Sequence, residues 1–215
     1  MGKFGGWKAN FSKNFPQKIA TRLAEPLEIL GARYTPVAFL GTQSINGTND
    51  AVLAEQIAMN GFDTKAAVIM VFNEKPNSND IAFLGARPLA EEGGKLGGTE
   101  IHVTTDIPNE AKEAFNEAIS GYTGAVITPV AYLGKQLVHG TNFDMIAEVK
   151  KDTASEASKL AFITVNSFYN TIKFADLFEL GDDETPEFNG AKIENGKLGY
   201  AFTWLTKKIN SPLGE

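Results

Sequence analysis

The side chains that most often perform catalysis are scarce in this sequence. It has no cysteine, so thiolate nucleophiles, disulfides and cysteine-bound metals are excluded. Its only two histidines, His102 and His139, disfavour multi-histidine metal sites and most histidine-based catalytic arrays. His139 falls at the tip of a predicted hairpin and His102 on the polar face of a predicted strand. The sequence assigns neither of them an acidic or nucleophilic partner. We interpret both as solvated side chains, and we predict no enzymatic activity and no cofactor.

The acidic residues suggest two further kinds of chemistry. Glu55 and Glu148 occupy matching positions in two copies of an internal repeat, and two such carboxylates could act as an acid–base pair. Charges on the solvent face of equivalent strands are the favoured interpretation. The run GDDETPEFNG at 181–190 could bind calcium, but it lacks the ligand spacing and the central glycine of a calcium loop. We therefore predict a solvated acidic loop there and no metal site.

The composition limits the classes of protein to which this chain can belong. The chain has 215 residues, of which 43% are hydrophobic and 21% charged, and its net charge is −6. These values are typical of a globular protein with one large or two small domains, and the acidic balance disfavours nucleic-acid binding. The longest uncharged run, 118–134, contains Pro129 and three glycines, so we predict no membrane span. The first residues form no apolar signal region, so we expect a cytoplasmic protein as encoded, or an extracellular or virion location after export or assembly.

An internal repeat is the most informative feature of the sequence. Residues 35–49 read TPVAFLGTQSINGTN and residues 128–142 read TPVAYLGKQLVHGTN, with ten of fifteen positions identical. The openings GKFGG at 2–6 and GKLGG at 94–98 also match, and a third opening, GKLGY, stands at 196–200. A period of this length indicates a duplicated structural unit. We predict a first unit over 1–92, a second over 93–180, and an acidic loop with a C-terminal strand over 181–215.

Each unit is predicted to contain one strand, one helix and four further strands. Apolar and polar residues alternate over 7–12 and 99–104, as in half-buried strands. Each strand precedes a helix whose apolar residues recur every four positions, and the two stripes are Ile19, Leu23 and Leu27, and Ala111, Phe115 and Ile119. Hairpins follow, turning at 46–47 and at 139–140, where glycine can adopt a positive φ. This order indicates the α+β class, with one helix packed across a curved antiparallel sheet in each unit.

The hairpin sequence QLVHG at 136–140, together with QSING at 43–47 and the glycine pair before each first strand, resembles the cystatin family. The resemblance implies two tandem cystatin-like units that bind papain-like cysteine peptidases and inhibit them. Cystatins insert a glycine trunk, a Gln-x-Val-x-Gly hairpin and a Pro-Trp hairpin into the peptidase cleft. Neither unit has Pro-Trp, since the corresponding loops read KPNSND at 75–80 and about SFYNT at 167–171. The residues implied to bind the partner are Gly5, Gly6, Gln43, Ile45, Gly47, Gln136, Val138 and Gly140.

Turn chemistry alone also explains these residues, because hairpins select glycine for positive φ and valine packs well in strands. The glycine pairs likewise suit a bend or a linker. The function expected from the sequence is therefore non-enzymatic protein binding, with peptidase inhibition as the first hypothesis.

The C-terminal segment supports the alternative, a structural or assembly protein such as a surface or virion decoration. Tyr200, Phe202 and Trp204 alternate with other residues after the third opening motif, which predicts a strand with one aromatic face. Such a strand cannot bury that face alone. It must pair with the second unit of the same chain or with a neighbouring copy, and strand exchange between copies would build an oligomer.

Overall fold

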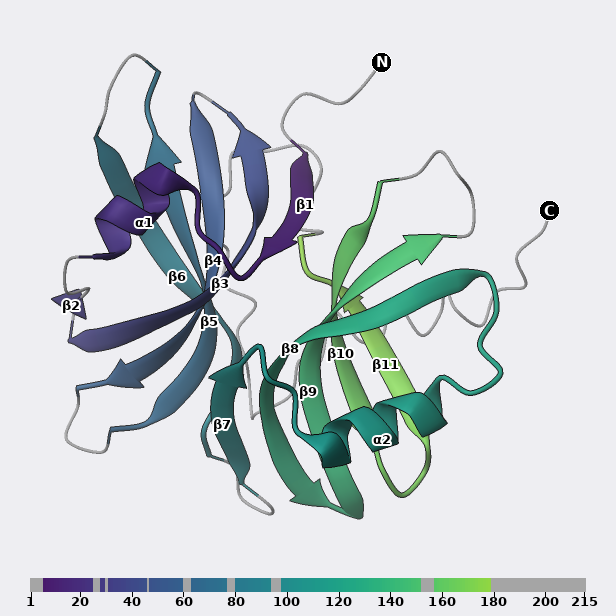
Figure 1. Cartoon of the computed structure of the whole chain (residues 1–215). Coiled ribbons are helices and arrows are strands. Elements are labelled where there is room, and N and C mark those ends of the chain that lie inside the picture. Colours follow the sequence, from purple (N-terminus) through teal and green to yellow (C-terminus); the bar gives the residue numbers. More distant parts are fainter. Residues whose placement is uncertain are drawn as a thin grey trace.

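A computed structural model describes residues 6–24, 28–29, 31–45, 47–59, 63–76, 80–93, 98–151 and 157–178. Most of these residues lie in strands, which form two antiparallel sheets (Figure 1). Gly5 and the predicted C-terminal strand with Tyr200, Phe202 and Trp204 lie outside the described residues.

The first sheet is built from residues 7–91. Its elements are β1 (Trp7–Ser12), α1 (Gln17–Leu23), β2 (Glu28–Ile29), β3 (Ala32–Ser44), β4 (Thr48–Ala58), β5 (Lys65–Glu74) and β6 (Ile81–Glu91). The strands run in the order β1-β3-β4-β5-β6, and β2 pairs with β3. Consecutive strands from β3 onward are therefore neighbours, while β1 crosses to the outer side of β3.

The second sheet repeats this arrangement with residues 99–176. Its elements are β7 (Thr99–Thr104), α2 (Asn109–Ala118), β8 (Ala125–Val138), β9 (Gly140–Lys151), β10 (Lys159–Asn166) and β11 (Thr171–Asp176). The strand order β7-β8-β9-β10-β11 matches that of the first sheet. The sequence repeat is thus a repeat of topology as well.

The duplication extends to irregularities within the strands. The pairing of β3 with β4 shifts register after Pro36 and after Phe39, and the pairing of β8 with β9 shifts after Pro129 and after Tyr132. Gly41 and its counterpart Gly134 stand just beyond the second shift in each unit, where the first strand crosses closely. A Cβ at either glycine would clash with a backbone carbonyl of β1 or β7, so the close strand crossing requires glycine there.

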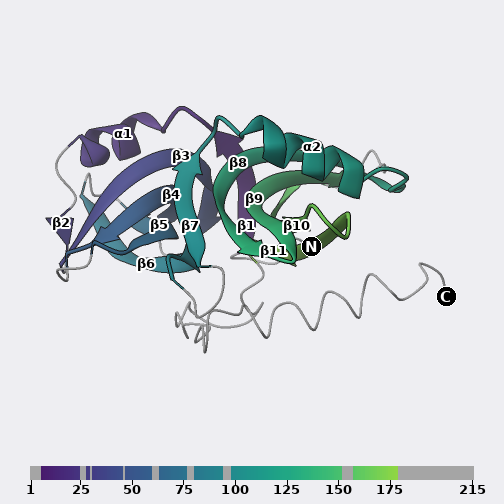
Figure 2. The same ribbon diagram turned by 90° about the horizontal axis from the view of Figure 1, so that it is seen from below.

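The main core lies between the two sheets. One cluster of 18 buried hydrophobic residues joins both units, and Leu40, Leu53 and Ile69 of the first unit share it with Leu133 and Phe162 of the second. The opening strands β1 and β7 are edge strands that lie where the two sheets meet (Figure 2), since β1 contacts β10 and β7 contacts β5 and β6. Burial of this shared face is the principal contribution holding the units together.

Specific polar and aromatic contacts also join the units. Glu55 Oε2 accepts a hydrogen bond from the Val103 backbone N–H at 3.2 Å, and its Oε1 lies 3.2 Å from Lys65 Nζ. Trp7 stacks on Phe178 with ring centroids 4.9 Å apart. Glu55 is therefore a contact between units rather than the solvent-face charge that the sequence favoured.

The expected α+β fold class, with one helix packed across the sheet of each unit, is wrong. Only two short helices occur among the described residues: α1 has 7 residues and buries Ile19 alone, and α2 has 10 residues. The physical reason appears in β5, where every residue from Ala66 to Phe72 is buried. A strand with two apolar faces needs a cover on both sides, and the other sheet provides the larger one. The fold is mostly β and does not support an α+β cystatin-like description.

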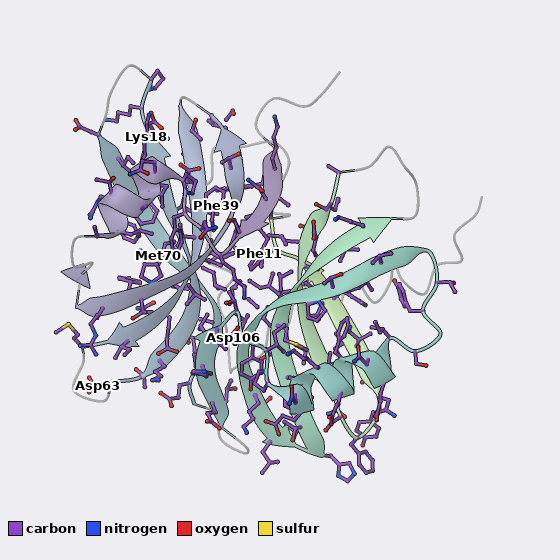
Figure 3. The ribbon with its side chains drawn as sticks, viewed as in Figure 1. Phe11, Lys18, Phe39, Asp63, Met70 and Asp106 are labelled. Atoms are coloured by element: carbon purple, nitrogen blue, oxygen red, sulfur yellow. The ribbon has the colours of Figure 1, made fainter. Side chains whose placement is uncertain are left out.

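The two short helices contribute a few residues to smaller cores on the faces turned away from the shared cluster. Ile19 of α1 belongs to one cluster with Phe39 and Met70 of the first sheet, the two residues that Figure 3 labels there, and Phe115 of α2 packs with Met145 of the second sheet. Neither helix is long and apolar enough to cross a membrane, and this holds for every helix in the described part of the chain.

Candidate protein-binding surface

Exposed apolar side chains gather at one end of the second sheet. Leu137 and Val138 end β8 with 70% and 41% of their surfaces exposed, and Phe168 and Tyr169, each 60% exposed, lie in the turn between β10 and β11. His139 lies between the two groups, with its ring centroid 4.2 Å from that of Phe168 and 5.7 Å from that of Tyr169. We name these five residues the tip surface. Clusters of exposed apolar residues of this kind mark interaction sites more often than isolated ones do.

Local chemistry explains why two neighbouring turns meet here. Gly140 has φ +81°, as a tight hairpin requires, and a Cβ there would lie 2.5 Å from the Cβ of Phe168. The absence of a side chain therefore lets the turn of β10–β11 close against the hairpin of β8–β9. The Thr141 N–H donates to Ser167 Oγ at 3.0 Å, and the Ser167 N–H donates to the Thr141 carbonyl at 2.9 Å. The two turns are thus bonded to each other.

The tip surface is uncharged. The two turns, residues 136–142 and 166–171, contain no Lys, Arg, Asp or Glu. A partner would therefore be held by apolar burial and by hydrogen bonds rather than by ion pairs. Aromatic side chains suit such a role, because they bury a large area at a low cost in side-chain entropy.

The first unit lacks this surface at the equivalent place. By alignment of the repeats, Lys75 and Pro76 stand where the second unit has Phe168 and Tyr169. Ile45 is only partly exposed, and Gly47 has φ +117° beside the Glu74 carbonyl. The described residues of this hairpin therefore present no exposed aromatic ring.

The glutamines of the two predicted motifs are placed differently. Gln43 is buried, with 9% of its surface exposed, and its Oε1 accepts a hydrogen bond from Asn49 Nδ2 at 3.1 Å. Asn49 Oδ1 in turn accepts one from Asn73 Nδ2. Gln43 therefore supports its hairpin from inside. Gln136, its counterpart, is partly exposed beside the base of the tip surface.

The structure brings together only some of the residues that the sequence selected. Val138 and Gly140 lie at the tip surface, while Gly6 is exposed just before β1 at the start of the first sheet. Phe168 and Tyr169 belong to the site although the sequence analysis did not select them. The usable signal was two adjacent aromatic residues in a predicted turn, a position where turn chemistry favours small polar residues.

Two carboxyl groups in the sheets have strongly raised pKa values. The pKa of Asp50 is raised to about 6, chiefly by burial and also by the nearby Glu74, while Lys18, which pairs with Glu74, opposes the shift. Burial also raises the pKa of Asp144 to about 6, against the effect of the Thr164 hydroxyl, which donates to Asp144 Oδ1 at 2.6 Å. Asp50 lies on β4 of the first sheet and Asp144 on β9 of the second.

No group of three or more histidine, cysteine, aspartate or glutamate side chains within the described residues is placed to hold a metal ion. The sequence matches no protein-family model, and no curated protein matches it either. The function must therefore be inferred from the surface of the protein itself.

Proposed function

We propose that this protein binds another protein through the tip surface of its second unit, and that the partner is a papain-like cysteine peptidase whose cleft the tip enters. The observation that supports this proposal is the gathering of four exposed apolar side chains on two bonded turns. The resemblance of QLVHG to the inhibitory hairpin of cystatins names the peptidase class. Because the fold differs from the one that the resemblance implied, the tip surface supports protein binding, and the hairpin sequence alone supports the choice of a peptidase as the partner.

The physical basis is preorganisation. A narrow cleft excludes most folded surfaces, but two adjoining turns present a thin edge of main chain and aromatic rings. Turns that are already bonded to each other lose little conformational entropy on docking. Aromatic residues at the centre of an interface commonly contribute about 2 kcal/mol or more each to binding. Phe168 and Tyr169 take the position of the missing Pro-Trp hairpin in this proposal.

The proposal predicts one binding site per chain. The first unit has Lys75 and Pro76 in place of the aromatic pair, so its hairpin offers no equivalent anchor. A titration of papain with the purified protein, followed by residual activity, measures this directly. We expect inhibition with an end point near one enzyme per chain, and an end point of two would show that the first hairpin also works.

Matched variants separate the tip from other exposed apolar residues. Val138→Asp and Tyr169→Ala remove contacts at the tip, whereas Met59→Asp changes a residue just after β4 that is 56% exposed and lies in the first unit. We expect the first two to weaken inhibition at least about tenfold and Met59→Asp to leave it unchanged. Absence of inhibition by the native protein at tens of micromolar would refute the peptidase proposal for papain.

A second candidate function is assembly by strand addition, and the open edge of the first sheet favours it. Among the described strands β6 pairs only with β5, and its residues 81–86 carry no charge. Uncharged sheet edges accept additional strands. If the C-terminal segment of a neighbouring copy supplies that strand, the solution mass rises with concentration, and deletion of 196–215 abolishes the rise. A concentration-independent monomer would refute this candidate.

A further inference from the structure

The side chain of Asn166, the last residue of β10, makes four hydrogen bonds. Its Nδ2 donates to Asn142 Oδ1 at 2.8 Å and to the His139 carbonyl at 3.3 Å. Its Oδ1 accepts from the backbone N–H groups of Phe168 at 3.1 Å and Tyr169 at 2.9 Å. One amide side chain therefore contacts both turns of the tip surface.

The two halves of this amide have separable effects. The oxygen shapes the β10–β11 turn, because it satisfies the N–H groups of the two aromatic residues in the manner of an Asx turn. The nitrogen holds the hairpin of β8–β9, because it bonds to the carbonyl at the hairpin tip and to the base of β9. An aspartate at position 166 would keep an oxygen that accepts from the Phe168 and Tyr169 N–H groups, but it would lose the Nδ2 group that donates to Asn142 and His139.

We propose that Asn166 is the positioning residue that joins the two turns into one binding element and sets His139 against Phe168. The part of this inference that concerns binding rests on the proposed function. The part that concerns geometry does not, because it can be measured in the protein alone.

The first unit supplies the matched comparison. Asn73 occupies the equivalent position, and its Nδ2 donates to Asn49 Oδ1, which reproduces the bond from Asn166 to Asn142. The cross-strand bond is thus common to both units and supports the sheet. The bonds that Asn166 makes to His139, Phe168 and Tyr169 belong to the tip surface.

The test compares Asn166→Asp with Asn73→Asp in the full chain. The chain has only two histidines, so the imidazole proton resonances of His139 and His102 can be followed by NMR without interference. In the native protein the Phe168 ring lies against the His139 ring and shifts its resonances. We expect Asn166→Asp to move the His139 resonances while those of His102 stay in place. Asn73→Asp is expected to move neither.

Thermal unfolding of both variants separates positioning from stability, because each loses the same cross-strand bond. We expect similar falls in melting temperature for the two, and at least an about tenfold loss of papain inhibition for Asn166→Asp alone. Unchanged His139 resonances in Asn166→Asp would overturn the geometric inference. Displaced resonances with full inhibition would overturn its role in binding. Failure of the native protein to inhibit papain would remove the proposed function, and the resonances would still decide whether Asn166 joins the turns.

If Asn166→Asp does not fold, Asn142→Ala provides a second variant. It removes the cross-strand acceptor and leaves the bonds from Asn166 to His139, Phe168 and Tyr169. We therefore expect Asn142→Ala to keep the His139 resonances in place. Their displacement would show that the cross-strand bond to Asn142, and not the bonds of Asn166 to the two turns, holds the His139 ring against Phe168.

Discussion

Asp144 allows a sharp test of the electrostatics of the core. It lies on β9 between Gly134 of β8 and Thr164 of β10. Because side chains alternate along a strand, it shares the face of Ile146, which belongs to the cluster between the sheets. Burial there disfavours the charged carboxylate and raises its pKa from 3.8 to about 6.

The shift has a definite consequence for stability. Between the unfolded value of 3.8 and the folded value of about 6, the folded protein holds a proton that the unfolded chain has lost. The free energy of unfolding therefore falls as the pH rises through this window, and the loss is complete above it. A shift of about two units corresponds to about 3 kcal/mol, or about 6–12 °C in melting temperature for a chain of this size.

The assay is urea or thermal unfolding of the native protein and Asp144→Asn between pH 4 and pH 8. Asparagine resembles the neutral carboxyl and still accepts the Thr164 hydroxyl, so we expect equal stability near pH 4 and a more stable variant at pH 8. Asp106→Asn is the control, since it removes the same charge from a side chain that is 95% exposed. A difference between Asp144→Asn and the native protein that does not change with pH, or a less stable variant at pH 8, would refute the reasoning.

Three other substitutions test the packing between and within the units. Phe162→Ala empties part of the shared cluster and should cost about 3–5 kcal/mol in unfolding free energy by urea titration. Gly134→Ala places a Cβ against a backbone carbonyl of β7 and should cost about 1–3 kcal/mol, whereas a Cβ at Gly98 makes only an ordinary contact with the Gly93 backbone at 4.0 Å, so Gly98→Ala should be nearly neutral in the same assay. Glu55→Gln weakens the bond to the Val103 N–H between the units, so hydrogen exchange of that amide should accelerate; an unchanged rate would contradict the contact.

Several features of the fold could be read from the sequence. The repeat indicated a duplicated segment, and the two sheets share one strand order. Glycine at the predicted turn of 139–140 has a positive φ, and β8 and β9 meet there as expected. These features are local, because turn chemistry and period-two alternation act over a few neighbouring residues.

The helices and the fold class could not be read in the same way. Apolar spacing predicted a first helix with a stripe of Ile19, Leu23 and Leu27. The structure has α1 end at Leu23 with only Ile19 buried, and Leu27 lies outside the described residues. A stripe shows that a segment has an apolar face but not which element covers it. The continuous run of buried residues in β5 shows that this strand has two apolar faces, which the sequence analysis did not predict.

The candidate site could likewise be predicted from the sequence only in part. The sequence indicated the hairpin of Val138 and Gly140, because its turn residues are distinctive. It gave no means of joining that hairpin to Phe168 and Tyr169, which lie some thirty residues further along the chain. Only the pairing of β9 with β10 sets the two turns side by side. In the first sheet, the pairing of β3 with β4 sets Gln43 opposite Asn49, to which its buried side chain is bonded.

The sequence by itself therefore determined the duplication, the scarcity of catalytic side chains and the hairpin turns, since each depends on residue types at short spacing. The tertiary structure decided that two sheets share one core, that Glu55 contacts the other unit, and that one end of the second sheet gathers exposed aromatic rings. Those outcomes depend on which apolar faces cover each other, and that is settled by contacts between residues far apart in the chain.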